Sequence, residues 1–369
     1  MTTREPTHIS LFMPSLAGGG AERMMLNLAR EFCGTGARVT LVLATSTGEY
    51  AHLVPPSVEV VDLNRPGVVT AIPRLAQYLR RTKPDSMLVT LDHAAVAAIF
   101  ANGIARAGTK VFVRQACGVS SQERPTLKER LLPWVQKVAY PFAEKVLAVS
   151  RGVADDIHIT LGVPRERIEV LANPVLTDDL HELALKPAGH PWVDEPSGPI
   201  ILAAGRLHRQ KGFDTLIDAF AMVPRSIGAR LIILGEGTLR ATLTEHAARL
   251  GVRELVSMPG FAKNPFAFMR RASVFVLSSR WEGMPGVLLQ AMACGCPVVS
   301  TNCPSGPDEI LNDGQLGPLV RVDDAAGMAE AIQSVLKKPT PADALRAAVS
   351  PYSAGNSAKR YLAVLARTA

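Results

Sequence analysis

The chain alternates between short, continuously apolar runs and longer segments with helical periodicity, and no other feature constrains its fold as much. In the first half, the apolar runs cover residues 8–13, 38–43, 58–61, 87–91, 110–113 and 145–149. In the second half, they cover residues 200–204, 230–234, 255–258, 274–277 and 297–300. Strands that are apolar throughout are typical of parallel sheets buried on both faces. The sequence therefore predicts an α/β protein in which helices cover parallel sheets.

The length of the chain and a break in this pattern predict two domains. The 369 residues exceed one ordinary α/β domain, and a polar stretch rich in Pro and Gly separates the two halves. We expect an N-terminal Rossmann-like domain over residues 1–180, a linker over 181–198 and a C-terminal Rossmann-like domain over 199–350. The last segment, 351–369, contains a helix that we expect to pack back on the N-terminal domain. Two doubly wound sheets that face each other would place the carboxyl ends of their strands around one cleft, where ligands bind.

The charge of the chain narrows the class of partner. The formal net charge is +7 and the isoelectric point is about 9.3. The basic residues are spread along the chain rather than gathered in an arm, which argues against nucleic acid as a partner. A phosphorylated substrate or an anionic membrane surface remains as the explanation of the positive charge.

The cysteines and the apolar segments indicate where such a chain works. There are five cysteines, an odd number, so a disulfide framework is not indicated and a cytoplasmic localisation is expected. The first residues lack the apolar stretch of a signal peptide. Residues 87–105 approach the length of a membrane span, but Asp92 and His93 interrupt them, so a strand, a loop and a helix are predicted instead.

Three glycines follow the first predicted strand and precede a helix. Gly18, Gly19 and Gly20 would let the backbone approach a ligand closely, and the helix N-terminus favours an anion. An ordinary strand–helix turn explains the glycines equally well. The spacing is not G-x-G-x-x-G, which argues against a nicotinamide cofactor.

Two cations follow the first strand of the second half. Gly205 and Arg206 begin the loop, and Lys211 and Gly212 end it before an amphipathic helix. Two fixed cations at the carboxyl end of a strand, beside a helix N-terminus, form a natural clamp for a diphosphate. The alternative is a pair of solvated loop cations.

A carboxylate stands in a later loop framed by Gly and Pro. Glu282 precedes an apolar helix and can accept hydrogen bonds from two adjacent hydroxyls of a sugar or ribose. Gln290 lies eight residues further on, about two turns down the same face. After the next strand, residues 305–309 form another turn into a helix whose N–H groups suit phosphate oxygens.

These motifs together resemble glycosyltransferase family 4. The sequences GRLHRQKG, LGEG, PGFAKNP and WEGMPGVLLQAMACGCPVVST are similar to the carboxyl half of the family, and GGGAER, AVSRGVADDI and the NPV turn at 173–175 resemble the amino half. The resemblance runs from about residue 8 to residue 335. It implies the GT-B fold, a retaining reaction and a nucleotide-sugar donor, with UDP as the expected nucleotide. The chain looks most similar to bacterial enzymes of lipopolysaccharide-core, O-antigen and lipid-linked glycan assembly, which implies a glycan or lipid-linked acceptor.

The resemblance also assigns roles to residues. Arg206 and Lys211 match the cations that hold the donor diphosphate, and Glu282 matches the acid that contacts the donor sugar. Gln290 stands where the second acid of the family usually binds the ribose, which is a departure, because an amide can hydrogen-bond but cannot act as a nucleophile or base. The resemblance implies further donor contacts at Gly19, Gly20, Gly205, Gly286, Val287 and Phe261.

A second departure concerns the amino half. Many family members carry a histidine after the fifth strand, whereas this chain reads VFVRQACG, with Arg114 and Gln115 in that region. Either residue is a candidate contact for the transferred sugar or the acceptor. His93, after the fourth strand, is another candidate, although a single histidine there is more often structural.

No metal or cofactor is predicted. The chain lacks a D-x-D motif and any acid or His cluster with metal-ligand spacing. A sugar-nucleotide epimerase and a phosphorylase are alternatives on the same architecture. An epimerase should carry more acids and histidines in the cleft, and a phosphorylase should be much longer. A non-catalytic sugar-nucleotide-binding scaffold stays open because of Gln290.

One amphipathic segment allows two interpretations. In residues 125–145, the apolar side chains fall on one side at helical spacing and three cations lie elsewhere. The segment either covers the amino-domain sheet or forms a surface for an anionic membrane or a lipid-linked acceptor.

Overall fold

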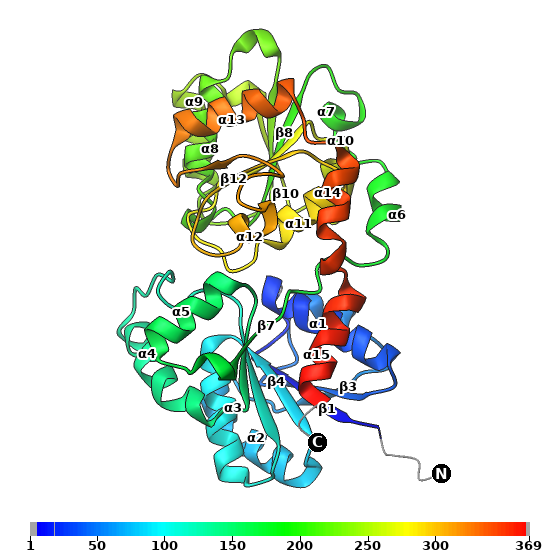
Figure 1. Ribbon diagram of the computed structural model, residues 1–369, viewed down its shortest axis with the longest axis vertical. Helices are drawn as coiled ribbons and strands as arrows, with labels where there is room; N and C mark the ends of the chain where they lie inside the picture. The colour runs from blue at the N-terminus through cyan, green and yellow to red at the C-terminus, as the bar shows by residue number, and fades with distance from the viewer. Residues whose placement is uncertain (1–5, 18, 367–369) are drawn as a thin grey trace. The chain divides into compact units, whose positions relative to one another are not determined.

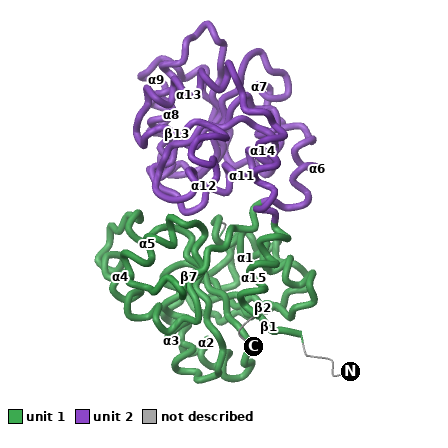
Figure 2. Tube along the Cα trace, viewed as in Figure 1, with its two compact units in different colours: residues 1–175, 354–369 green, residues 176–353 purple. Residues whose placement is uncertain are grey.

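The computed structural model describes residues 6–17 and 19–366. The chain divides into two compact units (Figure 2). Unit 1 comprises residues 1–175 and 354–369, and unit 2 comprises residues 176–353. Each unit is an α/β fold around its own sheet (Figure 1). Gly18 of the glycine motif lies outside the described residues.

Unit 1 is built on a parallel sheet of seven strands in the order β3-β2-β1-β4-β5-β6-β7. Its strands are β1 (His8–Met13), β2 (Arg38–Leu43), β3 (Glu59–Asp62), β4 (Ser86–Thr90), β5 (Lys110–Gln115), β6 (Lys145–Ala148) and β7 (Ile168–Val170). All neighbouring strands pair in parallel. The chain first winds from β1 to β3 and then returns to the other side of β1, so the topological switch point lies between β1 and β4.

Helices flank the sheet of unit 1, and most of them bury apolar side chains against it. They are α1 (Gly20–Gly34), α2 (Val68–Thr82), α3 (Asp92–Ala105), α4 (Leu127–Ala139), α5 (Arg151–Leu161) and α15 (Ala354–Ala366), with short 3₁₀ turns η1 (Glu49–Leu53), η2 (Tyr140–Phe142) and η3 (Arg165–Arg167). Helix α3 follows β4 directly, without the loop that we predicted in residues 87–105. None of the described helices is both long and apolar enough to cross a bilayer.

Unit 2 repeats the architecture with six strands in the order β10-β9-β8-β11-β12-β13. The strands are β8 (Ile200–Ala204), β9 (Arg230–Leu234), β10 (Val256–Gly260), β11 (Val274–Leu277), β12 (Val298–Thr301) and β13 (Leu319–Val320), all paired in parallel. The helices that follow them are α8 (Phe213–Met222), α9 (Arg240–Arg249), α10 (Pro265–Arg271), α11 (Gly286–Ala293), α12 (Pro307–Leu311), α13 (Ala325–Lys337) and α14 (Ala342–Val349), with 3₁₀ turns η4 (Arg209–Lys211), η5 (Arg225–Ile227), η6 (Arg253–Leu255) and η7 (Ser350–Tyr352). Here the switch point lies between β8 and β11. Two doubly wound parallel sheets confirm the predicted fold class.

The segment expected as a linker is folded into unit 2. Two short helices, α6 (Leu180–Leu185) and α7 (Pro191–Asp194), make up half of residues 181–198. The first packs against α10, where Asn264 and Arg271 donate hydrogen bonds to carbonyl oxygens of α6. The expectation of a linker rested on Pro, Gly and polar residues, but the segment also buries the apolar side chains of Ala184 and Val193.

The last helix, α15, belongs to unit 1. It packs on α1, and Tyr361 is fully buried in the core that the two helices share with β1. Ser357 Oγ and Arg360 Nη2 donate hydrogen bonds to the carbonyl oxygens of Asn173 and Val170. The chain therefore passes from unit 1 to unit 2 near residue 175 and returns near residue 354.

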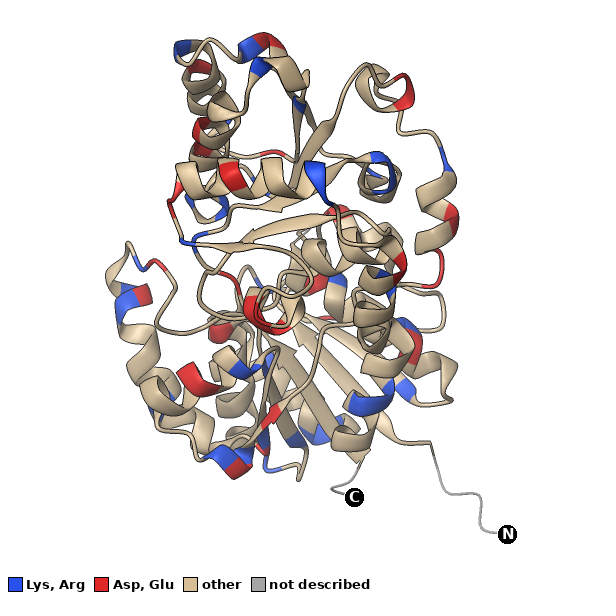
Figure 3. Cartoon of the chain, turned by 45° about the horizontal axis from the view of Figure 1, so that its top comes forward, with Lys and Arg blue, Asp and Glu red and all other residues tan. Residues whose placement is uncertain are grey.

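In Figure 3, Lys and Arg are interspersed with Asp and Glu along the helices and loops of each unit. This distribution matches the spread of Lys and Arg along the sequence.

Candidate active site

The topology of unit 2 brings two of the predicted motifs together. The loop after β8 carries Arg206 and Lys211, and the loop after β11 carries Glu282. Since β8 and β11 are the neighbouring strands at the switch point, both loops emerge side by side at the carboxyl edge of the sheet. Residues 71 positions apart in the sequence thereby reach hydrogen-bonding distance.

A glycine allows the two loops to approach. Gly212 has φ of +59°, and a Cβ at this position would lie 2.1 Å from the carbonyl oxygen of Ser278. Ser278 Oγ in turn donates a hydrogen bond of 2.7 Å to the carbonyl oxygen of Lys211. Only glycine fits such a left-handed position against backbone, so Gly212 determines where Lys211 lies.

Lys211 and Glu282 form a buried ion pair. Lys211 Nζ lies 2.5 Å from Glu282 Oε1, and Ser279 Oγ donates to the same oxygen at 2.6 Å. Side-chain exposure is 17% for Lys211 and 8% for Glu282. Both bonds end on Oε1, which leaves Oε2 of Glu282 and the remaining Nζ protons of Lys211 for a ligand. The pair holds its cation in place before any anion arrives, which is a form of electrostatic preorganisation.

A second ion-pair network, which the sequence did not single out, anchors the same loops. Arg280 binds Asp323 through Nε and Asp214 through Nη2, each at 2.8 Å. Its Nη1 donates to the carbonyl oxygen of Arg209. Burial opposes ionisation of Asp214, but the hydrogen bond and charge of Arg280 outweigh it, and the pKa of this carboxyl lies below its usual value. The cation directly before the WEG motif was the signal that could have revealed this anchor.

Helix α11 begins at Gly286, shortly after Glu282 in the chain. Gly286 and Val287 are its first residues, and their N–H groups have no acceptor one turn earlier in the helix. Gln290 lies in the second turn of α11 and is partly buried. Glu282 precedes the helix by four residues, so the expectation that Glu282 and Gln290 share one helical face is wrong. The E-x7-Q spacing spans a loop and a helix, because Pro285 caps the helix after Glu282.

Arg206 and Phe261 remain open to solvent. Arg206 is exposed, and within residues 6–17 and 19–366 its guanidinium forms no ion pair. Phe261, 66% exposed, follows β10 at the same edge of the sheet. Gly205 contacts the loop after β9. In that loop Gly235 has φ of +134°, and a Cβ at Gly235 would lie 2.0 Å from the carbonyl oxygen of Gly205.

The glycine motif of unit 1 lies at the other switch point. Gly19 is extended and caps α1 without a side-chain hydrogen bond, and Gly20 is the first residue of the helix. A Cβ on Gly20 would meet nothing within 4 Å, so the fold of unit 1 does not itself require glycine there. The open space and the uncapped helix N-terminus suit the close approach of a ligand.

Arg114 is buried in unit 1 and hydrogen-bonds to two other segments of that unit. It is 2% exposed, and its two terminal nitrogens donate to Thr90 Oγ1 at 2.9 Å and to Asn173 Oδ1 at 2.5 Å. These bonds join β5 to β4 and to the Asn173 turn. The sequence placed Arg114 at a strand end but did not show that its side chain points into the protein.

Gln115 orients the carboxylate of Asp92, a residue that the sequence did not indicate as part of a site. Gln115 Nε2 donates to Asp92 Oδ1 at 2.9 Å, and its Oε1 accepts from Tyr140 at 2.9 Å. Gln122 donates to the other oxygen of Asp92 at 3.2 Å. Burial raises the pKa of Asp92, although both amide donors oppose the rise. His93, the next residue, is exposed at the start of α3.

Acids, histidines and cysteines elsewhere in the described part of the chain are the remaining candidates. Within residues 6–17 and 19–366, no three His, Cys, Asp or Glu side chains gather closely enough to hold a metal ion. Cys294, Cys296 and Cys303 are buried thiols, and burial raises the pKa of Cys303 to about 12. Such thiols are unreactive packing residues.

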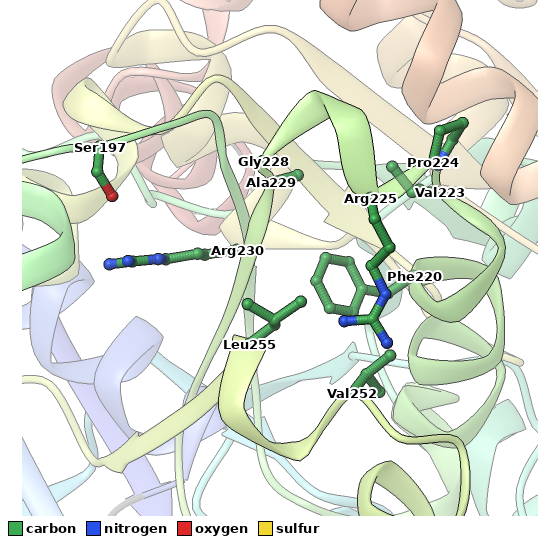
Figure 4. Close-up of a pocket in the computed structure, with 10 residues that line it drawn as sticks. All are labelled: Ser197, Phe220, Val223, Pro224, Arg225, Gly228, Ala229, Arg230, Val252 and Leu255. Carbon is green, nitrogen blue, oxygen red and sulfur yellow. The ribbon is translucent and has the colours of Figure 1, made fainter.

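A small cavity of unit 2 lies away from this site. It has a volume of about 270 Å³ and is lined by Gly228, Ala229 and Arg230, which lie at the amino end of β9 (Figure 4). Arg230 also stacks on Trp192, 4.8 Å from the ring centroid. Because doubly wound sheets bind ligands at the carboxyl ends of their strands, this cavity is not the site that the motifs define.

The fold and the carboxyl-edge residues define a class. A doubly wound sheet whose switch point carries a fixed cation, a carboxylate and a helix N-terminus is typical of α/β enzymes that bind nucleotide diphosphates. The class leaves the transferred group undefined.

Comparison with known proteins narrows the class to one family. Residues 19–174 match the model of the glycosyl transferase 4-like domain, and residues 198–338 match that of glycosyl transferases group 1. One relative, N-acetylgalactosamine-N,N'-diacetylbacillosaminyl-diphospho-undecaprenol 4-alpha-N-acetylgalactosaminyltransferase of Campylobacter jejuni, is 26% identical over 89% of this chain and 90% of its own. Lipopolysaccharide core biosynthesis glycosyltransferase LpsE of Rhizobium meliloti is 38% identical over 39% of this chain and 42% of its own. The structure of Anabaena Alr3699/HepE in complex with UDP and glucose matches with a TM-score of 0.80 at 21% identity, covering 98% of this chain and all of that one.

The chain belongs to glycosyltransferase family 4. Its fold is GT-B, and it is a glycosyltransferase. The resemblance drawn from the sequence motifs is thus confirmed.

Proposed function

We propose that this glycosyltransferase moves a sugar, with retention at the anomeric carbon, from a UDP-sugar to a glycan or lipid-linked acceptor of a bacterial surface polysaccharide. The observation that carries the proposal is the Lys211–Glu282 pair at the switch point of unit 2. Relatives named for lipid-linked and lipopolysaccharide substrates, and a structural neighbour bound to UDP, support the substrate classes.

The donor site follows from the chemistry of these residues. Arg206, Lys211 and the N-terminus of α11 would bind the diphosphate and stabilise the charge that develops as it leaves. Oε2 of Glu282 would accept hydrogen bonds from hydroxyls of the donor sugar. The exposed ring of Phe261 offers a surface for the base.

The donor site of unit 2 offers no carboxylate that is placed as a nucleophile, and this favours a mechanism without a covalent intermediate. Glu282 is already paired with Lys211, and Gln290 is an amide that cannot attack carbon. We favour attack by the acceptor hydroxyl on the face that the diphosphate leaves, with a donor phosphate oxygen taking the hydroxyl proton. Arg114 and Gln115 are engaged in hydrogen bonds inside unit 1. His93 and Asp92, at the carboxyl end of β4, are therefore the better candidates for contact with the acceptor.

The test of the proposed function is a donor panel. Purified protein is incubated with radiolabelled UDP- and GDP-sugars and with bacterial membrane extracts, and label in the lipid or glycan fraction is counted. Transfer from a UDP-sugar supports the proposal, and transfer from GDP-sugars alone would correct the nucleotide. Absence of both transfer and donor hydrolysis would favour a non-catalytic binding scaffold.

We expect activity to survive EDTA. The fixed charges of Arg206 and Lys211, together with the α11 N-terminus, supply the neutralisation that a metal ion supplies in other transferases. Initial rates measured before and after dialysis against EDTA should agree within about twofold. Loss of activity with rescue by Mg²⁺ or Mn²⁺ would show that a metal site has been missed.

Substitutions at Gln290 are expected to separate ribose binding from catalysis. Gln290→Glu should be tolerated, because a carboxylate accepts the same hydroxyl donors. Gln290→Ala should mainly raise KM. Replacing the normal donor by a 2′- or 3′-deoxy donor should lower kcat/KM less in this variant than in wild type, because the hydrogen-bond partner is already absent. Steady-state kinetics with both donors check this, and loss of kcat at saturating donor in Gln290→Ala would assign Gln290 to the transition state instead.

A further inference from the structure

Helix α4 turns its apolar side chains outward. Leu127, Leu131, Trp134 and Val138 lie along one side of the helix at helical spacing, and their exposed fractions are 72%, 52%, 70% and 66%. We call these four residues the α4 ridge. Surface helices usually bury such a stripe against the core. Of the two interpretations of this segment, burial against the sheet is therefore wrong for the ridge.

The outward orientation is built into the helix. The residues that α4 buries are Gln136 and Ala139. Gln136 Nε2 donates to Tyr140 Oη at 2.9 Å, and Tyr140 in turn binds Gln115. At its other end, Thr126 and Glu129 form a capping box. Capping and a buried polar anchor hold α4 in one rotation about its axis, so the exposed ridge is a defined feature of the fold.

The ridge leads into a groove between helices. Val138, Phe142, Phe100 and Ile104 line a cavity of about 830 Å³ beside α3. Phe142, Phe100 and Ile104 are 75%, 50% and 55% exposed. Helices α3 and α4 are in contact and lie side by side in Figure 1. The ridge and groove share Val138 and together form an exposed apolar surface of unit 1. Single scattered apolar side chains are common on protein surfaces, whereas an apolar surface of this size indicates a binding partner.

Cations accompany this surface. Arg80 and Arg106 line the groove, and Arg80 Nη2 donates to the carbonyl oxygen of Ile104 at 3.1 Å. Lys128, Arg130 and Lys137 are exposed on the other sides of α4. The acid of this helix, Glu129, is used in the capping box. The surface therefore suits an occupant that is both apolar and anionic.

We infer that the α4 ridge and the adjoining groove dock on the surface of a bilayer that contains anionic lipid. Trp134 and Phe142 enter the region between headgroups and acyl chains, and Arg80 and Arg106 bind lipid phosphates. A second copy of the chain fits less well, because two such faces would bring like charges together. The inference rests on the proposed function in that a lipid-linked acceptor requires the enzyme to work at a membrane.

The test is binding to vesicles without donor or acceptor, so that its outcome is independent of transferase activity. The full chain is sedimented with vesicles of phosphatidylcholine alone and of phosphatidylcholine with about one third phosphatidylglycerol. Trp134→Ser/Phe142→Ser is expected to lower partitioning into the mixed vesicles by about tenfold or more. Arg80→Glu/Arg106→Glu should abolish the preference for phosphatidylglycerol, as should high salt for wild type.

The matched control replaces exposed apolar residues of unit 2. Leu185 and Met222 are 65% and 54% exposed, and Leu185→Ser/Met222→Ser should bind vesicles as wild type does. All variants change exposed side chains, and equal melting temperatures verify that they fold. Transfer to a short-chain, water-soluble acceptor should be unchanged in Trp134→Ser/Phe142→Ser.

The inference is overturned if wild type binds neither vesicle, or if Trp134→Ser/Phe142→Ser binds vesicles as wild type does. It is also overturned if light scattering shows a wild-type dimer that Trp134→Ser/Phe142→Ser dissociates. The last outcome would make the surface an interface between copies. Loss of transfer to the short-chain acceptor would instead make it part of the acceptor site.

Discussion

Replacement of Lys211 by alanine is expected to lower kcat/KM by about two orders of magnitude or more, and Arg206→Ala should do the same. Each substitution removes one charge aimed at the leaving diphosphate, and preorganised contacts of this kind contribute that much in other enzymes. Steady-state kinetics with a saturating acceptor measure the effect. The two residues differ in setting, since Lys211 is held by Glu282 and Arg206 is exposed.

The control for net charge is Lys338→Ala, at an exposed position after α13. This variant should keep the wild-type kcat/KM. Near wild-type turnover in both Lys211→Ala and Arg206→Ala would contradict the assignment of these cations to the diphosphate.

Glu282→Ala is expected to affect stability and turnover together. It leaves the largely buried ammonium of Lys211 without its counter-charge, which costs about 3–5 kcal/mol in comparable buried pairs. It also removes the proposed sugar contact, so kcat should fall by about a hundredfold. Urea denaturation followed by tryptophan fluorescence and steady-state kinetics measure the two effects.

The double variant Lys211→Ala/Glu282→Ala provides the sharper comparison. The stability losses should not add, because the second substitution removes a charge that the first left unpaired. Glu245→Ala, at an exposed acid of α9, is the matched control and should leave the free energy of unfolding unchanged. Additive losses, or a Glu282→Ala variant as stable as wild type, would mean that the ion pair contributes nothing in solution.

The sequence predicted most strands of the two sheets but missed one edge strand in each. The runs at 8–13, 38–43, 200–204, 230–234 and 274–277 coincide with β1, β2, β8, β9 and β11, because central strands are apolar on both faces. The short edge strands β7 and β13 were missed. Their residues are only partly buried and give no continuous apolar run.

The site was predicted residue by residue but not as an arrangement. Lys211 and Glu282 each follow a strand, which local sequence reveals, whereas their contact depends on β8 and β11 being neighbours. The inward direction of Arg114 depends on Thr90 and Asn173, both distant in sequence. Likewise, helical spacing predicted α4, but its rotation depends on the buried Gln136. Local patterns determine which residues are available, and strand order determines which of them meet.

The return of the chain to unit 1 has a consequence for synthesis on the ribosome. The seven strands of unit 1 leave the ribosome first, but Tyr361 and its neighbours in α15, which complete their core, leave it only after unit 2. Between these events all of residues 176–353 must be made, and they form a unit with its own core. The order of synthesis and the order of completion are therefore reversed: the second unit can finish folding while the first still exposes the surface of α1 that α15 covers.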